Sequence, residues 1–136
     1  MASSGTVSRS SRRGDLAVSK PLVLVVEDEV LIRLNATRML EAAGFDTLQA
    51  GSADEAIVHL ETNQQIRIVF TDINLPGSMN GLRLAAAIRH RWPPIELVLT
   101  SGHVRVADNE IPARGHFLPK PYSSEQLVGT MRSFGI

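Results

Sequence analysis

Three apolar stretches of this chain lead into charged side chains that could take part in chemistry. The charged residues are Asp72 after residues 67–71, Glu27 and Asp28 after residues 22–26, and Lys120 just beyond residues 115–118. Lys120 is the only lysine after Lys20, because the chain otherwise uses arginine for positive charge. A compact ammonium differs from a planar guanidinium in size, hydration and donor geometry. A single lysine at such a position therefore indicates a specific role.

The carboxylates would form a cation site if the fold brings them together. Three carboxylates in one crevice repel each other and lose water, so each tends toward neutrality unless a cation is bound. Mg²⁺ accepts carboxylate oxygens, phosphate oxygens and several waters as ligands. No histidine lies at these strand ends, which disfavours zinc.

An aspartate in such a site can also react. Its carboxylate can act as a nucleophile and take up a phosphoryl group as an acyl phosphate. Charge on the transferred group is then neutralised by a metal ion, a lysine and a hydroxyl donor. Lys120 matches the second role, and Thr100, at the end of the apolar stretch 95–100, matches the third. The residues therefore favour a phosphoryl-accepting aspartate at Asp72.

The elements that must position these residues alternate along the chain. Apolar runs predict strands at residues 22–26, 67–71, 95–100 and 115–118, and a weak alternation predicts a short edge strand at 45–50. Amphipathic spacing and capping residues predict helices at 29–43, after Ser52, at 81–91 and after Ser123, with at most a short or irregular helix in 102–114. The alternation predicts a doubly wound parallel sheet with helices on both faces. Ligands of such sheets bind at the carboxyl ends of the strands, where the charged residues fall.

The composition indicates one globular domain. The chain has 136 residues, of which 43% are hydrophobic, and a formal net charge of zero, so composition gives no case for nucleic acid or membrane binding. No apolar run approaches the ~20 residues of a membrane span. The absence of cysteine excludes disulfides and thiolate chemistry and fits a cytoplasmic protein. Residues 1–20 are rich in Ser, Gly and Arg, which predicts a disordered tail.

Each of these features also has an ordinary structural explanation. Glu27 and Asp28 could form an acidic turn, Asp72 could begin a turn, and Lys120 could be a surface charge. Thr100 could cap the next helix. Their joint occurrence at the ends of four strands favours a common site.

Four motifs together resemble the receiver domain of bacterial two-component response regulators. They are VLVVEDE at 23–29, TDINLPG at 71–77, LVLTSG at 97–102 and FLPKPY at 117–122. The resemblance covers residues 21–134 and places the receiver domain at 21–136. It implies a flavodoxin-like fold with five parallel strands in the order 2-1-3-4-5.

The resemblance also implies the roles of the acidic residues. Asp72 would accept a phosphoryl group from a histidine kinase or phosphotransfer protein. Glu27, Asp28, Asp72 and the backbone carbonyl of Asn74 would hold Mg²⁺, with Mn²⁺ as the alternative ion. Glu27 stands where the family often has aspartate.

The remaining roles concern the response to phosphorylation. Thr100 would hydrogen-bond the phosphoryl group and move toward it, Lys120 would pair with it, and the Lys120–Pro121 peptide bond would be cis. Phe117 occupies the aromatic switch position of the family, although it has no hydroxyl group to bond.

Two stretches depart from the family pattern. The loop at 76–81 is one residue longer than usual, and the extra residue is expected to bulge on the surface. Residues 102–114 are short and poorly helical where the family has its fourth helix, so its usual dimer and output geometry do not carry over directly. This segment could instead act as an order–disorder switch.

The expected function is phosphorelay signalling by a stand-alone receiver, without a catalytic domain and with slow self-dephosphorylation. Its partners would be the kinase and a downstream protein, with no nucleic acid or membrane, and the chain would be a monomer or weak homodimer. A receiver fragment of a longer hybrid kinase or regulator is an alternative. A pseudo-receiver would lack Asp72 or Lys120, and an aspartyl-phosphate hydrolase would want an aspartate at Asn74, so both are disfavoured.

Overall fold

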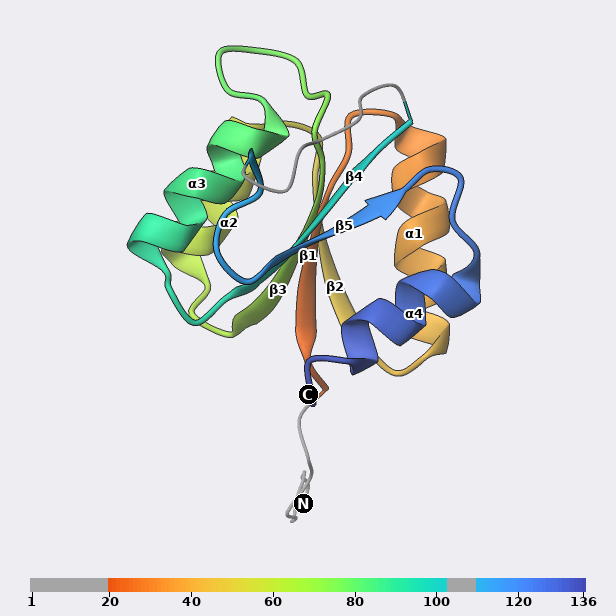
Figure 1. The fold of residues 1–136 in the computed structure, drawn as a ribbon. Helices are drawn as coiled ribbons and strands as arrows, with labels where there is room; N and C mark the ends of the chain where they lie inside the picture. Colours follow the sequence, from red (N-terminus) through yellow and green to blue (C-terminus); the bar gives the residue numbers. More distant parts are fainter. Residues whose placement is uncertain (1–19, 103–109) are drawn as a thin grey trace, which may run out of the picture.

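The computed structural model describes residues 20–102 and 110–136 and shows one five-stranded parallel sheet (Figure 1). The strand order is β2-β1-β3-β4-β5, as predicted. The strands are β1 (Leu22–Val26), β2 (Asp46–Ala50), β3 (Ile66–Asp72), β4 (Glu96–Ser101) and β5 (Gly115–Pro119). Each predicted strand lies within one residue of these bounds. The apolar runs of β1, β3 and β4 are almost wholly buried.

Helices cover both faces of the sheet (Figure 1). Those in the described ranges are α1 (Val30–Ala42), α2 (Ala53–Thr62), α3 (Gly81–Arg91) and α4 (Ser124–Arg132). One apolar cluster joins the sheet to α2 and α3, and includes Leu24, Leu60 and Leu84. The other joins it to α1 and α4, and includes Val25 and Leu127. Neighbouring residues of β1 thus pack against helices on opposite faces of the sheet. Because both faces are covered, the sequence of β1 is apolar without interruption.

The helix starts follow local sequence signals. Ser52 caps α2 by accepting a hydrogen bond from the N–H of Glu55, and Ser123 forms a reciprocal capping box with Gln126 at α4. The Glu55 side chain accepts from the Gly51 N–H, so the cap of α2 is not a reciprocal capping box like that of α4. Asn80, which sequence reasoning did not single out, caps α3.

The loop between β3 and α3 returns tightly to the sheet. Residues 76–78 are exposed and the loop projects from the body of the domain (Figure 1), consistent with the predicted surface bulge. Gly81 closes the loop by donating its N–H to the Ile73 carbonyl at 2.8 Å. A Cβ at Gly81 would lie 2.1 Å from the carbonyl oxygen of Asp72, so only glycine allows this approach.

Two predictions fall wholly or largely outside the described residues. They are the disordered tail at 1–20 and the irregular helix at 102–114, of which residues 103–109 are not described. Both stay predictions.

Candidate functional site

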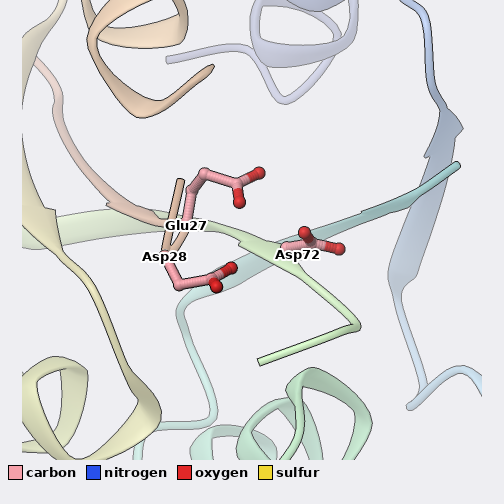
Figure 2. A group of neighbouring side chains, drawn as sticks. All are labelled: Glu27, Asp28 and Asp72. Atoms are coloured by element: carbon pink, nitrogen blue, oxygen red, sulfur yellow. The ribbon is translucent and has the colours of Figure 1, made fainter. Parts of the chain in front are cut away.

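Three carboxylates meet at the carboxyl edge of the sheet (Figure 2). Glu27 and Asp28 follow β1 and Asp72 ends β3, and these two strands are neighbours. One oxygen from each carboxylate lies within 4.8 Å of the others. Glu27 is 4% exposed and Asp72 is 6% exposed, whereas Asp28 is exposed. The site therefore combines two buried anions with one that opens to solvent.

Lys120 joins the two buried carboxylates. Its Nζ lies 2.8 Å from Oε1 of Glu27 and 3.0 Å from Oδ2 of Asp72. The ammonium reaches these groups from the end of β5, on the far side of β4. The Lys120–Pro121 peptide bond is cis, as expected.

Burial and charge act in opposite directions on this pair. Desolvation raises the pKa of Glu27 above its ordinary value, although hydrogen bonds from Lys120 and the Glu29 N–H oppose the shift. Desolvation also lowers the pKa of Lys120, but its hydrogen bonds to Glu27 and Asp72 and the negative charges of both carboxylates together outweigh this effect and leave the pKa raised. Lys120 is therefore held as a cation.

Backbone contacts fix the turn that carries Glu27. The Glu29 N–H donates to Oε2 of Glu27 at 3.2 Å. The Arg33 guanidinium donates to the Glu27 carbonyl at 2.7 Å and to the Gln49 side chain at 3.0 Å. Sequence reasoning missed Arg33. Its position on α1, one helical turn after Glu29, was the sequence feature that could have indicated a contact with the turn at Glu27.

Asp72 is held through both of its oxygens. Lys120 contacts Oδ2, and the backbone N–H of Asn74 donates to Oδ1 at 3.1 Å. The Asn74 side chain crosses to the next strand and donates to Oγ of Ser101 at 3.2 Å. Asn74 thus contacts Asp72 through its backbone N–H, while the role predicted for its carbonyl toward a metal stays a prediction.

Thr100 stands beside Asp72 on the neighbouring strand, where the two residues are paired in register. It is 3% exposed, and in residues 20–102 and 110–136 its Oγ1 finds no hydrogen-bond partner. Thr100, Glu27 and Asp72 line one small cavity of about 10 Å³. Burying a hydroxyl without a partner costs about 1–3 kcal/mol, so this donor is suited to a ligand that enters the site.

The donor set fits a magnesium ion and a phosphoryl group. The oxygen-only cluster Glu27, Asp28 and Asp72 matches the hard ligands that Mg²⁺ takes. Lys120 and the unpartnered Thr100 hydroxyl supply donors for phosphoryl oxygens. These features would be unnecessary in an ordinary acidic turn.

Two aromatic residues, Phe117 and Tyr122, lie on β5 and in the loop after it. Tyr122 stacks edge-on against Phe70 with ring centroids 5.5 Å apart, and burial raises its pKa. Phe117 is half-buried against the apolar cluster over α2 and α3. Its predicted switch role is not tested by this arrangement.

The fold and site define a class of protein: a doubly wound α/β domain that presents a buried aspartate, a lysine and a hydroxyl donor at its switch point. A family model described as the response regulator receiver domain matches residues 23–132. The chain belongs to this family of two-component signalling proteins.

Similar proteins share this domain. The chain is 34% identical over 114 residues to the sensor kinase CckA of Brucella abortus, covering 81% of this chain and 12% of that protein. It is 34% identical over 113 residues to the aerobic respiration control protein ArcA of Escherichia coli, covering 79% and 45%. A response regulator receiver protein from Pseudomonas putida superposes with a TM-score of 0.76 at 26% identity, covering 86% and 99%.

The chain spans less than half the length of these two curated relatives. No helix in the described ranges has both the length and the apolar character required to cross a membrane.

Proposed function

We propose that this receiver accepts a phosphoryl group on Asp72 from a phosphohistidine and signals through protein contacts. The observation that carries the proposal is the environment of Asp72. Its carboxylate shares Lys120 with Glu27, lies within reach of Asp28, and is paired in register with a buried threonine whose hydroxyl has no partner in the described ranges.

The chain's own residues account for the transfer. An Asp72 oxygen attacks phosphorus and forms an O–P bond, while the P–N bond of the donor breaks and its electron pair returns to the imidazole. Lys120 and Thr100 then donate to oxygens of the bound phosphoryl group. Glu27, Asp28, Asp72 and the Asn74 carbonyl would hold Mg²⁺, with Mn²⁺ as the alternative, and this ion would neutralise charge on the phosphoryl oxygens. Slow attack by water on the acyl phosphate resets the protein, so it acts as a phosphoacceptor rather than as a turnover enzyme.

An open groove beside the site suits the docking of the phosphodonor. It has a volume of about 620 Å³ and is lined by Leu31 and Ile32 of α1 and by Lys120, Pro121 and Tyr122. Leu31 is 81% exposed. Because Lys120 belongs to both the groove and the site, a helix carrying the phosphohistidine could lie in the groove and reach Asp72.

The test is phosphoryl uptake by the intact chain. The protein is incubated with Mg²⁺ and acetyl phosphate or phosphoramidate, and its intact mass is followed. We expect a gain of one phosphoryl mass that Asp72→Asn abolishes. Asp54→Asn, which alters an exposed aspartate on α2, serves as the matched control and should behave as wild type. No gain with either donor or with histidine kinases would contradict the proposal and favour a pseudo-receiver.

A further inference from the structure

Ser101 makes two contacts that converge on Asp72. It is the last residue of β4 and is 3% exposed. Its carbonyl accepts the backbone N–H of Lys120 at 3.1 Å, and its Oγ accepts the side-chain amide of Asn74 at 3.2 Å. One buried serine thus anchors a residue on each side of the site.

The two anchored residues are those that hold the Asp72 carboxylate. The Asn74 N–H donates to Oδ1 and the Lys120 ammonium donates to Oδ2. Lys120 is also tied to Glu27, whereas the backbone that follows Asp72 enters an exposed loop. The bond from Ile73 N–H to the Thr100 carbonyl, at 2.9 Å, holds the first residue of this loop. Beyond it, the Asn74 side chain joins the loop to β4.

The orientation of the carboxylate matters because its terminal torsion is soft. Rotation about the Cβ–Cγ bond of aspartate has broad minima, so contacts at both oxygens are needed to present one of them in a fixed direction. Holding a nucleophile near its attack geometry can contribute a large part of a rate enhancement. A change in the Asn74 loop would rotate the carboxylate even if Lys120 stayed in place.

We propose that Ser101 is a positioning residue for phosphoryl transfer, whose hydroxyl holds Asn74 so that the Asn74 N–H orients Asp72. This inference rests on the proposed function, because it concerns the same aspartate. A neutral hydrogen bond contributes a factor of about two to ten, so loss of this bond should slow phosphoryl uptake about fivefold. It should also weaken Mg²⁺ binding, since Asp72 and the Asn74 carbonyl are both expected ligands.

A double-mutant cycle on the full chain tests the pair. Ser101→Ala, Asn74→Ala and the double variant are compared with wild type for uptake from phosphoramidate at saturating donor and Mg²⁺. Asn74→Ala removes the amide side chain but keeps the backbone N–H. We expect each single variant to be about fivefold slower and the double variant no slower than either, as for partners in one contact. Ser133→Ala removes another bonded serine hydroxyl, at the end of α4, and should leave uptake unchanged.

Two further measurements separate positioning from general damage. Urea unfolding should show that the three variants remain folded at the assay temperature. A titration with Mg²⁺ alone, followed by NMR, should show weaker binding in both single variants without a further loss in the double. A structural defect would lower stability without this non-additive pattern.

The outcomes distinguish the two proposals. Uptake of a phosphoryl group by wild type supports the proposed function. The positioning inference is then wrong if Ser101→Ala matches wild type in uptake rate and in Mg²⁺ affinity. It is also wrong if the effects of the two single substitutions add in the double variant. If wild type takes up no phosphoryl group, the proposed function fails, and the Mg²⁺ cycle still tests whether Ser101 and Asn74 position Asp72. Unchanged affinity in Ser101→Ala then overturns the positioning inference.

Discussion

The three central strands and the two edge strands of this sheet differ in burial. In β1, β3 and β4 nearly every residue is buried, and Arg67 is the one exposed residue of β3. In β2 only Ala50 is buried, and in β5 only Leu118. Each central strand pairs with a strand on both sides, whereas β2 and β5 each pair on one side only.

The residues of the site also divide between central strands and an edge strand. The site's carboxylates and Thr100 belong to the ends of central strands, while Lys120 and Phe117 belong to the edge strand β5 or its end. Groups that must stay together are thus attached to the most completely packed part of the domain. The cation and the expected switch residue come from a part with fewer buried neighbours, where displacement costs less. Five substitutions, arranged as four predictions, test this comparison.

The largest difference should appear between matched leucines of the same apolar cluster. Leu99 of β4 is fully buried, and Leu48 of β2 is partly buried. We expect Leu99→Ala to lower the free energy of unfolding by about 3–4 kcal/mol, and Leu48→Ala by about 1 kcal/mol, because a smaller cavity remains at the edge. Urea unfolding measures both. Equal losses of unfolding free energy in the two variants would show that central and edge strands contribute alike to stability.

Gly81→Ala tests the contact between α3 and the end of β3. The added Cβ would meet the Asp72 carbonyl oxygen and the Ile73 Cα at 2.1 and 2.7 Å, and backbone atoms cannot move aside without displacing Asp72. We expect a loss of about 3 kcal/mol in unfolding free energy, together with slower phosphoryl uptake. Wild-type stability and uptake would show that the centre is more adaptable than its burial implies.

Lys120→Arg tests the cation that comes from the edge. The larger planar head cannot contact Glu27 and Asp72 as the ammonium does. We expect the fold to persist, with phosphoryl uptake about tenfold slower because the donor is misplaced. Mass spectrometry follows uptake, and circular dichroism checks the fold. Uptake at the wild-type rate would show that any cation suffices there.

The smallest effect should have the opposite sign. Gly129 lies exposed within α4, and a Cβ built there meets no atom within 4 Å. We expect Gly129→Ala to raise the free energy of unfolding by about 0.5–1 kcal/mol, since alanine favours helix over glycine. Thermal unfolding measures the change. A loss of stability would mean that a side chain at position 129 of α4 is as poorly accommodated as one at position 81.

The sequence predicts most of the fold because strands that are buried on both faces consist of apolar residues. Continuous apolar runs located the central strands, and Ser123 located the start of α4. The charged residues could be assigned to one edge because parallel strands place their carboxyl ends together. The convergence of Glu27, Asp28, Asp72, Thr100 and Lys120 follows from that topology alone.

The contacts that orient the site were beyond the sequence pattern. Arg33 reaches the Glu27 carbonyl, and Asn74 reaches Ser101, through particular side-chain conformations and strand offsets. Hydrophobic periodicity carries no information about either. The need for glycine at position 81 likewise depends on how closely α3 approaches the Asp72 peptide, which is a property of packing.

The ammonium bridge between Glu27 and Asp72 has a consequence for charge balance. Three carboxylates and one ammonium leave an excess of two negative charges at the strand ends, which a single bound divalent ion would cancel. Converting Asp72 to an acyl phosphate then adds about one more negative charge. The phosphorylated domain would differ from the resting, ion-loaded domain by this one uncompensated charge in a largely buried place. Lys120 and Thr100 are the donors that could approach this charge, and we expect phosphorylation to move the chain at these two residues.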